Sequence, residues 1–382
     1  MIRKRALALF LSLTLMGGVF TVAATGGTAT DPLVSKSHAD GTYTSQAVAK
    51  AEEQIAKRHD TLYATAESKL NAQADAYAAK LGGTATGGYY NAAFMDMRLK
   101  KGDVIQISTG SGFLLLAGTA VVSYSSGAVV DVSGGTVQSA GAITSGKRYL
   151  TAENTTASVT VTSPTAVLSV EGYYGETLSS ETDYNALALA LKTLGLFKGS
   201  DTAYGFGYDL EQPPTRIQGL IMFLRLLGEE KAALATTAKN PFKDVPAWCQ
   251  SYVAYAYEKG YTKGVDSAKM LFGTDSAMGA ADYMTFVLRA LGYQESGDAP
   301  DFTWSTALAS AARLGVLTAG EQKILAEQTF LRAHVAYVSY FALDASYKGG
   351  GQTLVQKLVS NGVFDQLIVD AVRGGVAVQR IS

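Results

Sequence analysis

The C-terminal half of the chain repeats its own pattern, and this repeat limits the folds open to it. Each unit reads as a helix, a glycine-centred turn, an irregular loop and a second helix. The units cover residues 183–230, 242–294 and 301–345. Their frames agree over a spacing of 13 residues, from Thr215 to Gly228, from Gly279 to Gly292 and from Leu331 to Asp344. One unit cannot bury its own apolar face, so we predict that the three pack together as an all-α bundle.

Several motifs in these units resemble the S-layer homology (SLH) repeat of bacterial surface proteins. Unit two opens with Phe242-Lys243-Asp244-Val245-Pro246 followed by Trp248, and contains the turn Gly260-Tyr261-Thr262-Lys263-Gly264. It ends with Leu288-Arg289-Ala290-Leu291-Gly292, and unit one supplies the helix start Thr215-Arg216. The motifs keep their order and spacing between units. The resemblance covers roughly residues 183–345, which is under half of the chain.

The resemblance implies non-covalent attachment to the cell wall. In the family, three repeats form a pseudo-threefold bundle whose grooves bind secondary cell-wall polysaccharide, typically through an acidic pyruvylated sugar. The family motif Thr-Arg-Ala-Glu maps onto residues 215–218, which read Thr-Arg-Ile-Gln. Its arginine is kept as Arg216 and Arg332, whereas unit two has Ala280. The family's acidic position is occupied by Gln218, Asp282 and His334. We therefore expect one or two working grooves.

The residue types of this motif suit an anion site. Thr215 followed by Gln218 is a capping-box pattern, which defines a helix start. Arg216 then lies in the first turn, where a cation opposes the helix dipole. A ligand carboxylate can accept two parallel hydrogen bonds from a guanidinium, and further bonds from free N–H groups at the helix start. The alternative is a surface salt bridge, for instance between Arg216 and Glu211.

Aromatic and other residues near these motifs allow two interpretations. Trp248 and Trp304 can stack on a sugar, although burial in the bundle is the simpler prediction for both. Cys249 is expected as a small buried hydrophobe, and His334 as a partly buried helix residue or a ligand contact. Packing alone explains Tyr252, Tyr255, Tyr257 and Tyr261. The predicted polysaccharide-binding residues are Arg216, Arg332, Thr215, Gln218 and Trp248.

The middle of the chain, residues 83–178, has a different character. Short β-type runs such as 104–107, 113–116 and 159–161 are separated by Gly and Ser turns about every eight to ten residues. We predict a small all-β sandwich or barrel, with a cupin-like or solenoid-like winding as variants. Single acids are scattered through it and are expected to lie solvated in turns; they are Asp103, Asp131, Glu153 and Glu171.

The two ends of the chain carry further segments. Residues 1–24 have a basic start and an apolar stretch, which predict a secretory signal, with an uncleaved membrane anchor as the alternative. Residues 25–43 suggest a flexible lead. Residues 44–82 are rich in helix formers and predict one long helix, either a coiled-coil stalk or an amphipathic helix packed on its own protein. The tail, residues 346–382, suggests short helices docked on the bundle.

Composition narrows the function classes. The 382 residues carry a net charge of -1. The predicted signal contains three basic residues and no acidic residue, so cleavage would leave a net charge of -1 - 3 = -4. There is no global basic field for nucleic acid. One cysteine and three scattered histidines leave little for a zinc site. Residues 25–175 show no paired carboxylates in a setting typical of a hydrolase, and no Gly-x-Ser-x-Gly elbow.

These observations together predict a multidomain α and β protein with a long N-terminal helix, a small all-β domain and a C-terminal all-α bundle of three helix-loop-helix units. We expect a secreted protein at the cell wall that binds polysaccharide, without catalytic residues, metal or another cofactor, and without a membrane span once the signal is cleaved. Other surface proteins are a second candidate class of partner. The alternatives are a structural S-layer array protein and a wall-active hydrolase.

Overall fold

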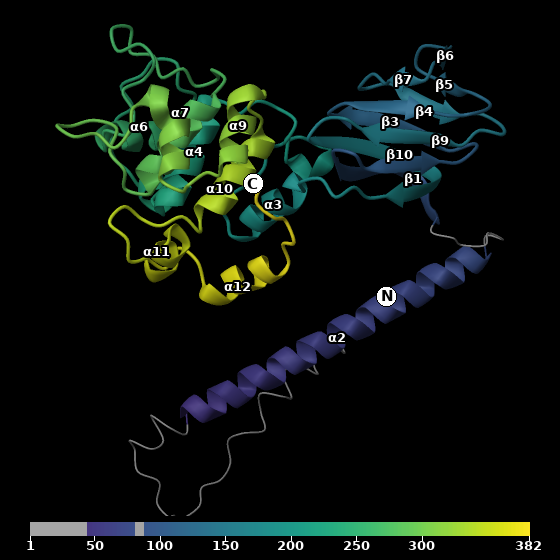
Figure 1. Ribbon diagram of the computed structural model, residues 1–382, viewed down its shortest axis with the longest axis horizontal. Coiled ribbons are helices and arrows are strands. Elements are labelled where there is room, and N and C mark those ends of the chain that lie inside the picture. The colour runs from purple at the N-terminus through teal and green to yellow at the C-terminus, as the bar shows by residue number, and fades with distance from the viewer. Residues whose placement is uncertain (1–43, 81–87) are drawn as a thin grey trace, which may run out of the picture. The chain divides into compact units, whose positions relative to one another are not determined.

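The computed structural model describes residues 44–80 and 88–382 of the chain, which divides into two compact units between residues 86 and 87. The predicted signal (1–24) and lead (25–43) lie outside the described residues. In the first unit, α2 (Thr44–Lys80) is a helix of 37 residues without Gly or Pro (Figure 1). Val48, Ile55 and Leu62, which recur every seven residues, are exposed on this helix. Among the described helices, none combines the length and the apolar character that crossing a membrane requires.

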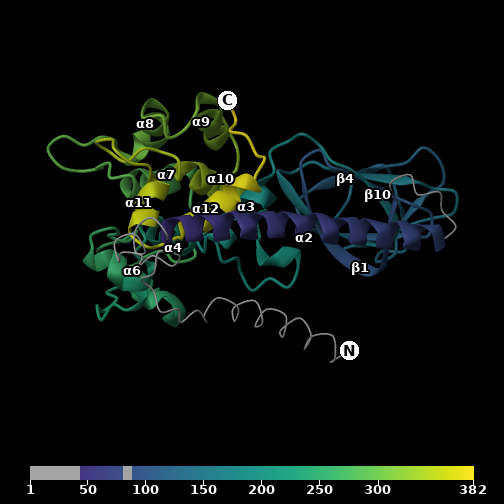
Figure 2. The same cartoon turned by 90° about the horizontal axis from the view of Figure 1, so that it is seen from below.

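The second unit begins with one antiparallel sheet. Within residues 88–382 it comprises β1 (Gly88–Lys100), β2 (Val104–Ile107), β3 (Gly112–Ala117), β4 (Ala120–Ser123), β5 (Val129–Asp131), β6 (Thr136–Gln138), β7 (Gly141–Ala142), β8 (Arg148–Thr151), β9 (Ala157–Val161) and β10 (Thr165–Thr177). The strand order is β6-β5-β8-β3-β10-β2-β9-β4-β7, with β1 paired to β10. Figures 1 and 2 show the strands curling into a half-barrel.

Strand β10 organises this sheet because it has two neighbours on one edge. It pairs with β1 over its length, with β3 through residues 167–171 and with β2 through residues 174–177. Gly172 lies where the neighbour changes, at φ 85°, and a Cβ there would meet the Ser111 Oγ at 2.5 Å. The change of neighbour therefore requires a glycine. The inner face buries residues such as Ile105, Phe113 and Tyr149.

The fold class expected from the sequence is wrong. We predicted a small all-β domain over 83–178 beside a separate all-α bundle. The strands instead form one large curled half-barrel sheet in the middle of the chain, with helices before and after it in sequence. The sheet and all the following helices belong to one compact unit. The sequence hid this because β1 does not alternate apolar and polar residues regularly, and its partner β10 begins 65 residues after the end of β1.

Two of the acids expected in solvated turns are also buried. Asp103 accepts hydrogen bonds from the backbone N–H groups of Lys100 at 2.9 Å and Ser179 at 2.8 Å. Asp131 pairs with the Lys147 ammonium at 2.6 Å and accepts from the Gly134 N–H. Buried carboxylates need such partners. The prediction of solvated acids is therefore wrong for these two; Glu153 is exposed, and Glu171 pairs with Arg148.

The helices follow the sheet in chain order. They are α3 (Tyr184–Thr193), α4 (Arg216–Leu227), α5 (Glu230–Leu234), α6 (Gln250–Glu258), α7 (Ala280–Ala290), α8 (Ala307–Arg313), α9 (Ala319–Glu327), α10 (Arg332–Ala342), α11 (Leu354–Ser360) and α12 (Gln366–Gly374). Helices α4 and α7 pack closely, with the rings of Phe223 and Phe286 stacked at 4.8 Å. Gly219 of α4 packs against Met278, which lies just before α7; a Cβ there would lie 2.2 Å from the Met278 sulfur, so this side chain would have to move.

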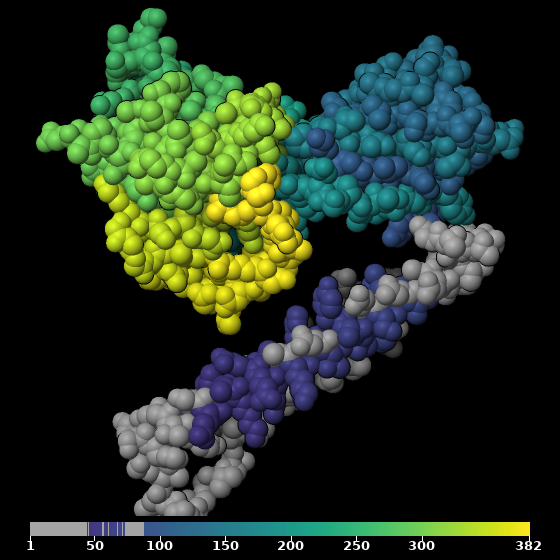
Figure 3. Space-filling view, viewed as in Figure 1, coloured from purple at the N-terminus to yellow at the C-terminus, as the bar shows by residue number. Residues whose placement is uncertain are grey.

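One arginine joins the sheet to the helices. The Arg98 guanidinium, on β1, pairs with Glu211 at 2.6 Å, and both side chains are almost fully buried. Its Nε donates to the Asn185 side chain on α3 at 2.8 Å, and its Nη1 donates to the Gly205 carbonyl at 2.9 Å. Figure 3 shows the surface of the sheet meeting that of the helices without a break. These contacts explain physically why the sheet is not a separate domain.

A second arginine contact occurs three times among the helices. Each time, a guanidinium donates to the backbone carbonyl that follows a glycine in the left-handed conformation, and pairs with a glutamate. The three sets are Arg225 with Leu196 and Glu230, Arg289 with Tyr261 and Glu295, and Arg380 with Val316 and Glu321. The third arginine comes from the tail rather than from a repeat helix. The tail therefore completes the third helix-turn unit.

Candidate functional site

The start of α4 carries the first group of predicted ligand residues. The Gln218 side chain accepts a hydrogen bond from the Thr215 backbone N–H at 3.0 Å, as the capping pattern predicted. The N–H groups of Arg216 and Ile217 donate to the carbonyls of Ser276 and Thr274, at 2.9 and 3.2 Å. The expectation that these N–H groups are free for a ligand is therefore wrong. The loop that precedes α7 occupies them, and only side chains remain for recognition.

The positive charge of the Arg216 side chain has few compensating contacts among the described residues. It is partly buried, and its guanidinium lies over the Phe272 ring at 5.4 Å. Among the described residues, its side chain makes one hydrogen bond, from Nη2 to the Thr262 hydroxyl at 3.5 Å. Its Nε is buried and has no partner, and no carboxylate in the described ranges forms an ion pair with it. Burial lowers the pKa of Arg216, and the charge of Asp282 opposes this. The alternative salt bridge to Glu211 is wrong, because Glu211 pairs with Arg98.

Arg332 lies at the equivalent position of α10 but in another environment. Only 6% of the residue is exposed. Its Nε donates to the Tyr208 carbonyl at 3.1 Å, and its guanidinium lies over the Phe197 ring at 5.3 Å. Burial lowers its pKa, and the nearby charges of Asp209 and Glu211 oppose this. Arg332 therefore holds the segment before α4 in place and presents no face to a ligand.

Both tryptophans are exposed, contrary to the burial that we favoured. Trp248 is 63% exposed and Trp304 is 54% exposed. The Trp304 indole N–H donates to the Asp282 carboxylate at 2.7 Å, which orients its ring. Cys249, next to Trp248, is fully buried as predicted, and burial raises the pKa of its thiol to about 11. The sequence placed Asp282 in the motif frame but did not connect it with Trp304.

His334 is a buried structural residue. Its Nδ1 accepts from the Leu331 backbone N–H at 3.0 Å, so it caps α10 as Gln218 caps α4. Its Nε2 is buried without a partner within the described residues, and Tyr184 and Phe330 pack against the ring. Desolvation lowers the pKa of His334 to about 4. The imidazole is therefore neutral in the folded protein at neutral pH.

We expect this histidine to make folding stability depend on pH. Its pKa is about 4 when folded and about 6.5 when unfolded, so the unfolded chain takes up the proton first as the pH falls. The contribution of the neutral His334 to folding stability is therefore complete above the pKa of the unfolded chain. It is lost as the pH falls toward the pKa of the folded protein. Between about pH 7.5 and pH 5 the loss is about 2 kcal/mol.

Urea unfolding at several pH values measures this loss. The matched variant is His334→Gln, because Gln218 already provides the same cap in α4. The variant keeps an acceptor for the Leu331 N–H and removes the titration. We expect its stability to be flat over this pH range. An equal pH slope in both proteins would contradict the role of His334.

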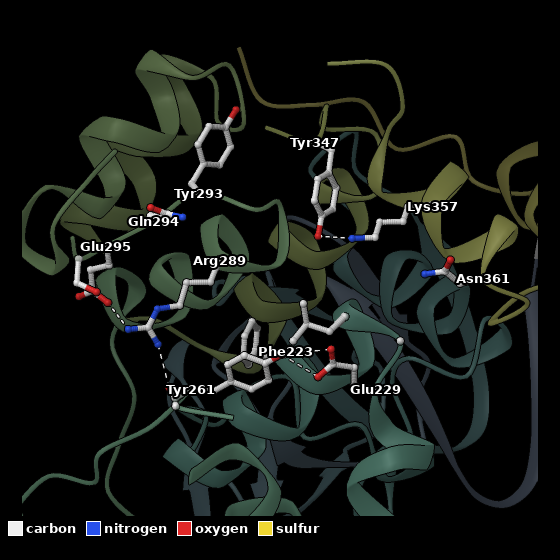
Figure 4. Close-up of a pocket in the computed structure, with 14 residues that line it drawn as sticks. Phe223, Glu229, Tyr261, Arg289, Tyr293, Gln294, Glu295, Tyr347, Lys357 and Asn361 are labelled. Atoms are coloured by element: carbon white, nitrogen blue, oxygen red, sulfur yellow. Dashed lines mark hydrogen bonds and ion pairs between the residues drawn. The ribbon is translucent and has the colours of Figure 1, made fainter. Parts of the chain in front are cut away.

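A pocket of about 750 Å³ lies at the C-terminal ends of α4 and α7. Figure 4 shows Tyr293, Gln294 and Glu295 on one side, and Tyr347, Lys357 and Asn361 on the other, with Arg289, Phe223 and Glu229 between them. The lining residues come from the end of α4, the turn after α6, the end of α7 with its following loop, and the segment 347–361 that contains α11. The sequence reading quoted Arg289 only as part of a repeat ending. Gly260 and Tyr261 belong to the predicted turn motif, but no pattern in the sequence indicated that these residues meet, since they are far apart in the chain.

Part of the chain is similar to a known protein of the cell surface. No family model matches the chain. A stretch of 145 residues is 32% identical to a protein of Thermoanaerobacter kivui named "Cell surface protein". The match covers 37% of this chain, and the chain spans only 18% of the length of that relative. Within the described residues, no group of three or more His, Cys, Asp or Glu side chains is placed to hold a metal ion.

Proposed function

We propose that the protein lies at the cell surface and binds an acidic cell-wall polysaccharide through Arg216. The observation that carries this proposal is the partly buried Arg216 guanidinium, which has no carboxylate partner in the described part of the chain. An uncompensated cation in such a place is costly, and an anionic ligand removes the cost. The SLH-like motifs and the name of the matched relative both support a surface location.

The neighbours of Arg216 fit an acidic sugar. A carboxylate can accept two bonds from one guanidinium, which adds geometric selectivity to the charge attraction. Asp282, whose charge acts on Arg216, also holds the Trp304 ring through a hydrogen bond, and this ring offers an apolar face for a sugar ring. Thr215 and Gln218 fix the helix start that positions Arg216. Trp248 is exposed and is proposed as a further polysaccharide contact.

The proposal also covers export and mechanism. Residues 1–24 are proposed to direct secretion, and other surface proteins remain a second class of partner. The role is binding without catalysis and without a cofactor. Zymography on purified wall tests this part, because a cleared zone would assign the protein to the hydrolases instead.

Co-sedimentation with purified wall sacculi tests the arginine directly. We expect Arg216→Ala to weaken binding at least about tenfold, because a charge-assisted pair contributes about 1.5–3 kcal/mol. Arg216→Lys should recover only part of the affinity, since an ammonium cannot form the two-pronged contact. Circular dichroism checks that the variants stay folded, which we expect because the lost Arg216 side chain makes one long hydrogen bond within the described residues.

The matched control is Arg58→Ala, which removes the same charge from an exposed position on α2. It should leave sedimentation unchanged. Chemical removal of the acidic polysaccharide from the sacculi should abolish binding of the unaltered protein. Full binding by Arg216→Ala, or full binding to stripped sacculi, would overturn the proposal.

A further inference from the structure

We propose that the pocket at the C-terminal ends of α4 and α7, lined also by α11, is a second binding site and that it binds a neutral oligosaccharide. Its volume of about 750 Å³ lies in the range of small-ligand sites. The site is made by different residues from those around Arg216, so it goes beyond the polysaccharide binding proposed above. Three properties of the pocket lead to this ligand class.

The first property is the balance of charge. Two cations and two carboxylates line the pocket: Arg289, Lys357, Glu229 and Glu295. Arg289 is already paired with Glu295 and also donates to the Tyr261 carbonyl at 2.9 Å. The Lys357 ammonium lies against the Tyr347 ring, 3.7 Å from its centre. The formal charges of the lining therefore sum to zero, so net charge does not favour a charged ligand, and a neutral ligand can use the remaining polar atoms.

The second property is a set of unused hydrogen-bonding groups beside aromatic rings. Over residues 88–382, the side chains of Tyr293, Gln294 and Asn361 have no recorded hydrogen-bond partner. They lie on two opposite sides of the pocket (Figure 4). Sugars present hydroxyl groups around an apolar ring face. The amides of Gln294 and Asn361 can form hydrogen bonds with the hydroxyl groups, and the Tyr293 ring can pack on the apolar face. An apolar ligand would leave these groups unpaired.

The third property is a rigid floor. The Glu229 carboxylate accepts hydrogen bonds from the hydroxyls of Tyr255 at 3.1 Å and Tyr261 at 3.0 Å. The Tyr261 ring packs edge-on against Phe223 at 5.2 Å. Gly228 adopts a left-handed conformation that ends α4 directly before Glu229. Acceptors that are fixed before binding reduce the entropic cost of holding a ligand.

Isothermal titration calorimetry tests the pocket with three defined probes on the full chain carrying Arg216→Ala, because this substitution removes the proposed acidic-sugar site. These are a tetramer of N-acetylglucosamine, a tetramer of glucose and a tetramer of galacturonic acid. We expect at least one neutral tetramer to bind saturably, and the acidic tetramer to bind at least about tenfold more weakly. Binding of neither neutral tetramer up to millimolar concentration would overturn the proposal, as would preference for the acidic one.

Variants separate this site from the one at Arg216. Tyr293→Ala and Asn361→Ala should each weaken binding of the neutral tetramer, by about tenfold for the tyrosine, since a buried aromatic contact contributes most. Trp304→Ala is the matched control and should leave this binding intact. Tyr293→Ala should still sediment with wall sacculi, whereas Arg216→Ala should bind the tetramer but not the sacculi. Unaltered tetramer binding by both pocket variants would place the ligand elsewhere and overturn the assignment.

Discussion

Replacement of Arg98 by alanine is expected to lower the free energy of unfolding by about 3–5 kcal/mol, because it leaves Glu211 as a buried charge without its partner. The variant also loses the hydrogen bonds to the Asn185 side chain and the Gly205 carbonyl. All three contacts join β1 to the segments around α3 and the loop before α4. Urea unfolding followed by circular dichroism measures the loss.

Two further variants make the Arg98 test specific. The double variant Arg98→Met with Glu211→Leu removes both charges and fills the space, so it should recover more than half of the lost stability. Arg148→Ala breaks an ion pair with Glu171 on the same sheet, where the arginine is half exposed, and should cost at most about 1 kcal/mol. A loss below about 1 kcal/mol for Arg98→Ala would contradict the proposed coupling of sheet and helices.

Replacement of Arg380 by alanine should cost about 3 kcal/mol of unfolding free energy. Its guanidinium pairs at 2.5 Å with Glu321, whose side chain is 1% exposed, and donates to the Val316 carbonyl at 2.8 Å. Without Arg380 the Glu321 carboxylate keeps only its bonds from the Tyr337 hydroxyl and the Thr318 N–H. A residue in the tail therefore stabilises the turn between α8 and α9.

Thermal and urea unfolding of three proteins test this contribution of the tail. Adding Glu321→Gln to Arg380→Ala removes the buried charge while keeping an acceptor for the Thr318 N–H, and should recover part of the stability. Arg373→Ala is the matched control, because its pair with Asp344 is exposed on both sides. It should change stability by at most about 1 kcal/mol. Equal losses for Arg373→Ala and Arg380→Ala would show that the burial of Glu321 does not matter.

The starts of three helices could be predicted from the sequence. The repeat frame placed Thr215, Gly279 and Leu331 in register, and α4, α7 and α10 each begin at the next residue. Capping interactions and glycine turns act over three or four residues, so their pattern is visible locally. The same holds for α2, whose residues are strong helix formers without an interruption. Burial of Cys249 also followed from its residue type.

Residues at equivalent sequence positions nevertheless received different roles. Arg216 and Arg332 are both the first residue of a helix. Within the described residues the Arg216 Nε has no hydrogen-bond partner, whereas the Arg332 Nε donates to the Tyr208 carbonyl. The difference comes from Phe197 and Tyr208, which cover Arg332 and lie more than a hundred residues before it. The exposure of Trp248 and Trp304 was missed for the same reason. The neighbours of a side chain are set by the packing of distant segments.

The sequence by itself determined the local elements: the long helix, the positions of the helix starts, the glycine turns and the composition that speaks against a metal site. The tertiary structure decided how these elements combine. It paired β1 with β10, buried Arg98 against Glu211, brought Arg380 from the tail to the third turn and assembled the pocket from four separate segments. Short-range hydrogen bonding is encoded within a few residues, whereas burial and ion pairing depend on which distant surfaces meet.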